Sequence, residues 1–153
     1  MTSKDFCDMI ISGWCVMTRH EQRYKAMTIL YQAFLYDSNH INYDIDMVID
    51  EQLETKNKFV RTLVMGVLDN RQKLVNIANH YLENWDIERL GFTDQAILLI
   101  GIYEILSTVT PDITCIDEAI ELSKEYSDDK VSKMINGVLD KVYHKKEKIM
   151  SNK

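Results

Sequence analysis

The residues best suited to bind an anion lie at the start of a predicted helix that begins near residue 18. Arg19 and Arg23 are four residues apart, so a helix places both on one face. His20 and Lys25 add two more basic side chains to the same segment. A guanidinium group can bind phosphate through two parallel hydrogen bonds. This spacing predicts contacts to neighbouring phosphates, and the alternative is an ordinary solvated first turn.

Two lysines near the other end of the chain have a similar setting. Lys130 and Lys133 lie at the start of the last predicted helix. Lys130 ends the polar run from residue 127 to residue 130, and Lys133 follows it. Backbone N–H groups at a helix N-terminus favour a bound anion. We therefore expect a second phosphate-binding position there, unless both lysines are simply solvated.

Catalytic and cofactor sites have little support in the sequence. The four histidines, at positions 20, 40, 80 and 144, show no metal-ligand spacing. Three cysteines, at positions 7, 15 and 115, contain no C-x-x-C pair and predict neither a disulfide framework nor a zinc site. The five glycines are too dispersed for a phosphate-binding loop. We expect no enzyme activity, no metal and no cofactor.

Charge is distributed unevenly along this acidic chain, which has a formal net charge of −6. Residues 36–56 contain six acids and one base, whereas residues 141–153 contain five lysines and one glutamate. Residues 14–35 have a balance of +2. Nucleic acid is attracted by local positive fields, so an RNA-binding surface should use the basic segments. The acidic segment would suit a basic protein partner or remain solvated.

Helical periodicity runs through the whole sequence, and no sustained alternation indicates a strand. Helices are predicted at about 3–12, 18–36, 44–55, 56–82, 94–107, 115–126 and 129–148. The helix at 94–107 is apolar on nearly every side and should lie at the centre. Gly66 and Gly137 fall inside helices, where glycine costs ~1 kcal/mol. We therefore expect another backbone to approach closely at Gly66, and close helix packing at Gly137.

Together these elements predict one all-α domain over residues 1–153, a compact bundle of about seven helices. Residues 1–13 would be an N-terminal extension, and residues 143–153 a basic tail that either attracts RNA or is a disordered end. No apolar run approaches the roughly 20 residues of a membrane span, and no secretory signal is recognised. A cytoplasmic location is expected.

The amino-acid sequence of residues 115–140 is more informative than its composition. One helix contains Glu-Ala-Ile-Glu-Leu-Ser-Lys, and the next contains Asn-Gly-Val-Leu-Asp. This pair resembles the NusB family of bacterial transcription antitermination factors. Further similar pieces, in the same order, are the basic segment with Ala26 and Leu30-Tyr31, the run from Trp85 to Leu90, and the run from Asp94 to Leu98. The resemblance covers about residues 19–142.

The resemblance implies a non-enzymatic factor that binds boxA-type single-stranded RNA of ribosomal operons. It also implies a partner, the small-subunit ribosomal protein NusE, and an antitermination complex on RNA polymerase. The RNA contacts that it suggests are Arg19, His20, Arg23, Lys25, Tyr31, Tyr81, Lys130 and Lys133. In this set the two tyrosines would contact bases or sugars, as aromatic side chains do with unpaired RNA.

This chain departs from the family pattern at two places. Glu21 and Gln22 occupy positions where basic residues are usual, and Met134 replaces a frequent aromatic. These departures leave a protein-interaction bundle without RNA affinity as an alternative. The same fold also occurs as the RNA-binding domain of ribosomal-RNA cytosine methyltransferases. A homodimer stays open, because some members of the family pair.

Overall fold

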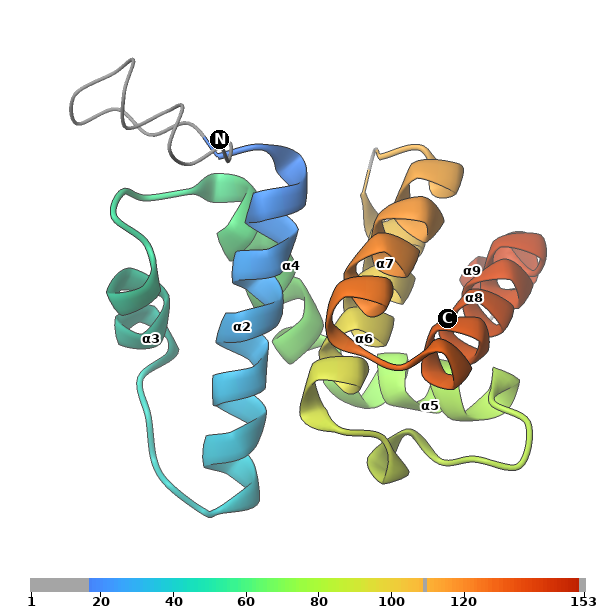
Figure 1. The fold of residues 1–153 in the computed structure, drawn as a ribbon, viewed down its shortest axis with the longest axis horizontal. Helices are drawn as coiled ribbons and strands as arrows, with labels where there is room; N and C mark the ends of the chain where they lie inside the picture. Colours follow the sequence, from blue (N-terminus) through green and yellow to red (C-terminus); the bar gives the residue numbers. More distant parts are fainter. Residues whose placement is uncertain (1–16, 109, 152–153) are drawn as a thin grey trace.

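The computed structural model describes residues 17–108 and 110–151, and all regular structure in these ranges is helical (Figure 1). Eight α-helices and one 3-10 helix form there. They are α2 (Arg19–Ser38), α3 (Ile45–Gln52), α4 (Lys58–Asp69), α5 (Arg71–Tyr81), η1 (Ile87–Arg89), α6 (Phe92–Ser107), α7 (Asp112–Tyr126), α8 (Asp129–His144) and α9 (Lys146–Ser151). The predicted all-α fold is confirmed. The helix predicted at residues 3–12 lies outside the described residues.

Helix α6 lies at the centre of the bundle, as its sequence predicts. It packs against α2 and α4 on one side and against α7 and α8 on the other, while α5 crosses near one end (Figure 1). Ten of its residues, between Gln95 and Ile105, are buried. A helix with apolar residues all round leaves no face for solvent. In the described ranges no helix, α6 included, is long and apolar enough to cross a membrane.

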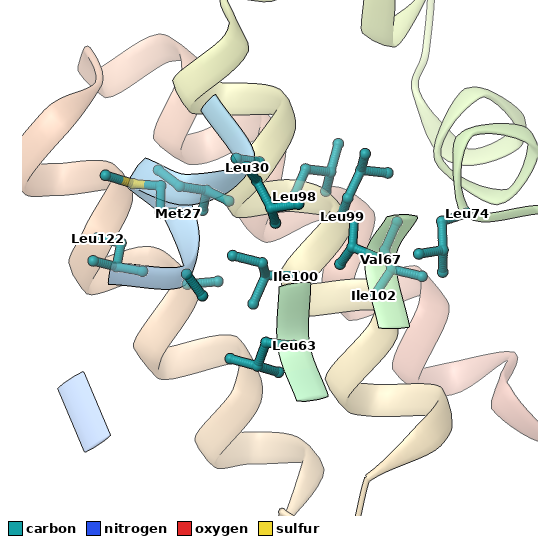
Figure 2. Packing of buried hydrophobic residues seen from close by; sticks show 14 of the residues in the cluster. Met27, Leu30, Leu63, Val67, Leu74, Leu98, Leu99, Ile100, Ile102 and Leu122 are labelled. Carbon is teal, nitrogen blue, oxygen red and sulfur yellow. The ribbon is translucent and has the colours of Figure 1, made fainter. Parts of the chain in front are cut away.

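The hydrophobic core joins side chains from most of the surrounding helices (Figure 2). Its labelled members are Met27 and Leu30 of α2, Leu63 and Val67 of α4, Leu74 of α5, four residues of α6 between Leu98 and Ile102, and Leu122 of α7. Each fully buried side chain of this kind stabilises the fold by roughly 1.5–3 kcal/mol. Two charged residues, Arg23 and Glu104, are buried among them.

The prediction of one long helix over residues 56–82 is wrong, because α4 and α5 are separate helices. Asn70 divides them. Its side-chain amide donates to the carbonyl of Gly66 at 2.8 Å, and its backbone N–H donates to the same carbonyl at 3.2 Å. Asparagine competes for backbone groups in this way, which favours helix ends over helix interiors. The break allows α5 to turn across the bundle (Figure 1).

The last predicted helix is also two helices. α8 ends at His144, and Lys145 separates it from α9. Within the predicted basic tail, residues 146–151 therefore form a helix instead of a disordered end. Ile149 packs against the core, and Lys146 forms an ion pair with Asp112 at 3.1 Å. The described part of the tail thus contributes to the fold.

Two other helices begin earlier than predicted. α6 starts at Phe92, with Gly91 at its N-cap. α7 starts at Asp112, directly after Pro111. Proline has a fixed φ and no N–H group, which suits the start of a helix, where that N–H would have no partner.

The two helix glycines differ in their surroundings. A Cβ on Gly66 would lie 2.1 Å from Cζ of Tyr103, so a close approach exists, but the Tyr103 side chain of α6 makes it and not a backbone as predicted. A Cβ on Gly137 would meet nothing within 4 Å, and this glycine is exposed. The expected packing at Gly137 is therefore wrong.

Candidate nucleic-acid interface

The start of α2 presents the predicted basic segment. Thr18 caps the helix, and its side-chain oxygen accepts a hydrogen bond from the backbone N–H of Glu21 at 3.1 Å. Arg19 is exposed and donates to Oε1 of Gln22 at 2.9 Å, and its guanidinium lies 4.0 Å from the ring centroid of Phe59. Arg19 thus turns toward α4. It remains accessible to an anion on that side of the helix.

Arg23 does not face solvent. Its side chain enters the core, where Nε and Nη2 donate to the two carboxylate oxygens of Glu104 at 2.8 and 2.9 Å. The exposed fractions are 3% for Arg23 and 1% for Glu104. Burial alone would lower the pKa of Arg23, but the hydrogen bonds and charge of Glu104 raise the pKa above its ordinary value. Arg23 cannot reach a phosphate in this conformation, so the predicted contact does not fit.

His20 is also engaged by carboxylates. Nδ1 lies 3.0 Å from Oε2 of Glu118, and Nε2 lies 2.8 Å from Oε1 of Glu125. The hydrogen bond with Glu118 raises the pKa of His20, burial opposes this, and Glu125 raises the pKa further. Both ring nitrogens therefore hold α2 against α7. The predicted phosphate contact by His20 does not fit this geometry either.

An aromatic pair lies directly beside this ion cluster. Tyr24 of α2 stacks on Tyr126, the last residue of α7, with ring centroids 5.1 Å apart and planes inclined by 28°. Tyr126 has an exposed fraction of 46%. An exposed aromatic ring is a surface on which an unpaired base can stack. The RNA contacts predicted from the sequence include neither Tyr24 nor Tyr126. Tyr126 does end a helix directly before the polar run at residues 127–130, which the sequence identifies.

Lys130 and Lys133 occupy the start of α8, as predicted. The carboxylate of Asp128 caps this helix by accepting from the backbone N–H of Val131 at 2.8 Å. Both lysines are exposed, and neither takes part in the ion pairs of the described residues. They are thus available to bind an anion, four to seven residues beyond Tyr126.

The two predicted tyrosines lie in different places. Tyr31 is 43% exposed and packs edge-on against Phe92 at the start of α6, with centroids 6.2 Å apart. Tyr81 is half-buried at the end of α5 and lines an open cleft of about 620 Å³ together with Lys148 of α9. Lys25, also half-buried, is in no ion pair of the described residues.

Four residues on the two sides of the polar joint between α7 and α8 make up what we call the joint face: the stacked pair Tyr24 and Tyr126 before it, and Lys130 and Lys133 after it. The polar joint between α7 and α8 connects them, and a hydrogen bond from Ser127 to Asp94 ties this joint to the start of α6. Arg19 points away toward α4, so it is not part of this face. In the described ranges no group of three or more His, Cys, Asp or Glu is arranged to hold a metal ion.

Comparison with known proteins gives a consistent assignment. The sequence pattern of the NusB family matches residues 20–144. A NusB transcription antitermination protein of Campylobacter jejuni is 41% identical over 126 residues, which are 80% of this chain and 93% of that protein. One of Staphylococcus aureus is 39% identical over 82% of this chain and 98% of its own length. For one of Lactococcus lactis, 47% identical, the match spans 65% of this chain and half of the relative.

Solved structures show the same fold. The NusB structure of T. maritima superposes with a TM-score of 0.75 at 26% identity, covering 88% of this chain and 98% of that one. A structure described as antitermination factors NusB and NusE in complex with dsRNA has a TM-score of 0.67 at 24% identity, covering 84% and 98%. At that identity the second likeness concerns the fold alone. The family match and the curated relatives make the assignment plain: the chain belongs to the NusB family of non-enzymatic transcription antitermination factors.

Proposed function

We propose that this NusB-family protein binds single-stranded boxA-type RNA through the joint face and supports antitermination by RNA polymerase in the cytoplasm. One observation carries the proposal: the exposed ring of Tyr126, backed by Tyr24, ends α7, and two exposed lysines without ion-pair partners in the described residues follow it at the start of α8. The ring offers a stacking surface, and the lysines offer charge for phosphates. Unpaired bases can stack in this way, whereas bases inside a duplex cannot.

The joint face supplies few charges. Lys130 and Lys133 are its only cations, and Asp128 and Asp129 are close in sequence. Binding that depends on so few phosphate contacts needs additional area from stacking or from a second protein. The small-subunit ribosomal protein NusE, the partner that the family resemblance implies, would provide that area. Assembly on RNA polymerase, and any homodimer, belong to the same proposal.

The test is RNA affinity over a salt series, with and without the ribosomal protein. Tyr126→Ala should weaken binding of a boxA-type single strand by roughly 5- to 150-fold without changing the salt slope. Lys130→Ala with Lys133→Ala should instead lower the slope by about 1.4, since each single-strand phosphate contact contributes about 0.7. Tyr143→Ala, at the far end of α8, and Lys56→Ala, between α3 and α4, replace exposed residues and are the matched controls.

Two results would reject the proposal. One is equal affinity for the single strand in all four variants. The other is preference for a duplex of the same sequence, because a stacking surface has no access to paired bases.

A protein-interaction bundle without RNA affinity is the second candidate. It is favoured by the fact that His20 and Arg23, two of the predicted cations, are neutralised inside the protein by glutamates. In that case the ribosomal protein would bind as before, and no strand would bind even in its presence. The methyltransferase alternative is not carried further, because relatives matched over 93% or more of their own length are antitermination proteins.

A further inference from the structure

Trp85 lies in the connection between α5 and η1, where it is half-buried and packs against the core. Two cations lie over its ring. The guanidinium carbon of Arg89 is 4.7 Å from the ring centroid, and Nζ of Lys130 is 5.6 Å from it. Arg89 belongs to η1 and Lys130 to α8, so one aromatic ring brings together charges from distant parts of the chain.

This arrangement holds two like charges at one ring, at most about 10 Å apart given their distances of 4.7 and 5.6 Å from its centroid. Arg89 and Lys130 are both exposed, and neither takes part in an ion pair among the residues that the structure describes. The negative face of the indole attracts each cation and limits the directions that its side chain samples. Two cations held in this way repel each other until an anion lies between them or beside them.

The geometry suits a phosphate better than a base. A stacking base would need the space over the ring that the two cations occupy. Arg89 can donate two parallel hydrogen bonds to phosphate oxygens, and Lys130 adds a compact second charge. Asp86 and Glu88, exposed near Arg89 in sequence, keep the surrounding field weak, so the cluster fits one discrete phosphate instead of a long track.

We propose that Arg89 and Lys130, positioned by Trp85, form a binding site for one RNA phosphate. Lys130 also belongs to the joint face, so the site extends that face from the end of α7 to η1. The inference rests on the proposed function and adds to it Arg89 as a contact and Trp85 as a positioning residue. Both belong to the run from Trp85 to Leu90 that resembles the family, but neither is among the RNA contacts that the resemblance suggests.

The experiment uses the full chain with the ribosomal protein and a labelled boxA-type single strand over a salt series. Arg89→Ala should reduce the salt slope by about 0.7, which corresponds to about 8-fold weaker binding at 50 mM salt if the contact vanishes near 1 M. Lys56→Ala, an exposed lysine between α3 and α4, is the matched control and should leave both values unchanged.

Trp85 needs variants that separate positioning from folding. Trp85→Leu keeps every charge, so affinity should fall by several-fold while the salt slope changes little. Trp85→Phe retains an aromatic face and should restore most of the affinity. In the double variant Trp85→Leu, Arg89→Ala, the loss should be smaller than the product of the two single losses, because both act through one contact.

Each other outcome overturns the inference in a recognisable way. If Tyr126→Ala weakens RNA binding while Arg89→Ala behaves like Lys56→Ala, the proposed function holds and this site does not exist. If Arg89→Ala weakens binding of the ribosomal protein in the absence of RNA, the cation pair docks a protein instead. If the unaltered chain binds no strand even with its partner, the proposed function itself fails.

Discussion

Replacing Arg23 separates a structural role from an RNA contact. In Arg23→Met, the side chain keeps much of its aliphatic volume but leaves the carboxylate of Glu104 buried without its partner. Removing one member of a buried ion pair costs about 3–5 kcal/mol, out of a typical total stability of about 5–15 kcal/mol. The geometry is favourable for a cost of this size, since both partners are almost fully buried and the pair is bidentate at 2.8 and 2.9 Å.

Urea unfolding followed by far-UV circular dichroism measures the loss in free energy of unfolding, and thermal unfolding followed in the same way measures the change in Tm. For a chain of this length, 1 kcal/mol corresponds to roughly 2–4 °C in Tm, so Arg23→Met should melt roughly 6 to 20 °C lower. Adding Glu104→Leu removes the orphaned charge. The double variant should recover most of the loss, because a buried ion pair can be replaced by apolar residues at little cost.

The RNA affinity of Arg23→Met provides the second measurement, made at a temperature where the variant is folded. A buried arginine neutralises no phosphate, so the salt slope should equal that of the unaltered chain. The phosphate contact that the sequence predicts for Arg23 would instead reduce the salt slope by about 0.7. The structural argument would be refuted by a variant of unchanged stability whose salt slope is reduced.

Three further outcomes follow from the described contacts. Gly66→Ala should destabilise the protein by about 1–3 kcal/mol through the Tyr103 ring, whereas Gly137→Ala should stabilise it by about 0.5–1 kcal/mol; thermal unfolding of both variants checks this pair. Because glutamates of α7 raise the pKa of His20 above its ordinary 6.5, the stability that His20 contributes is complete below that pH and is lost as pH rises through the folded pKa. The free energy of unfolding of His20→Gln should therefore decrease less with rising pH than that of the unaltered chain. Burial raises the pKa of Cys115 to about 12, so iodoacetamide at pH 8 should modify it only after unfolding, as mass spectrometry of its peptide would show.

The sequence was sufficient to predict an all-helical fold and to identify the helix at the centre of the bundle. The run from residue 94 to residue 107 has no polar face, which leaves it only a buried position. The breaks at Asn70 and Lys145 were missed because the apolar spacing continues across them. At Asn70 the helix ends through hydrogen bonds to one carbonyl, and periodicity contains no signal for such a local competition.

The candidate site was less predictable, since a cation's availability depends on tertiary contacts. Arg19 and Arg23 are both arginines, and their spacing places them on one face of the predicted helix. Yet Arg19 is exposed, whereas Arg23 is paired with Glu104, 81 residues away. The stacking of Tyr24 on Tyr126 joins positions 102 residues apart, so only the fold reveals it. Lys130 and Lys133 were predictable because a helix start next to a polar joint is a local feature.

These internal pairings determine what kind of RNA binding the protein can support. With His20 and Arg23 used inside the fold, the joint face and Arg89 together offer three cation–phosphate contacts, two of them to one phosphate. Three single-strand contacts give a salt slope near −2, so affinity would fall roughly 20-fold between 50 and 200 mM salt. A protein with 6–10 duplex phosphate contacts loses about 10³ to 10⁵ over the same range. Binding at physiological salt must therefore depend mainly on stacking and on the partner, and specificity would come from unpaired bases rather than from charge.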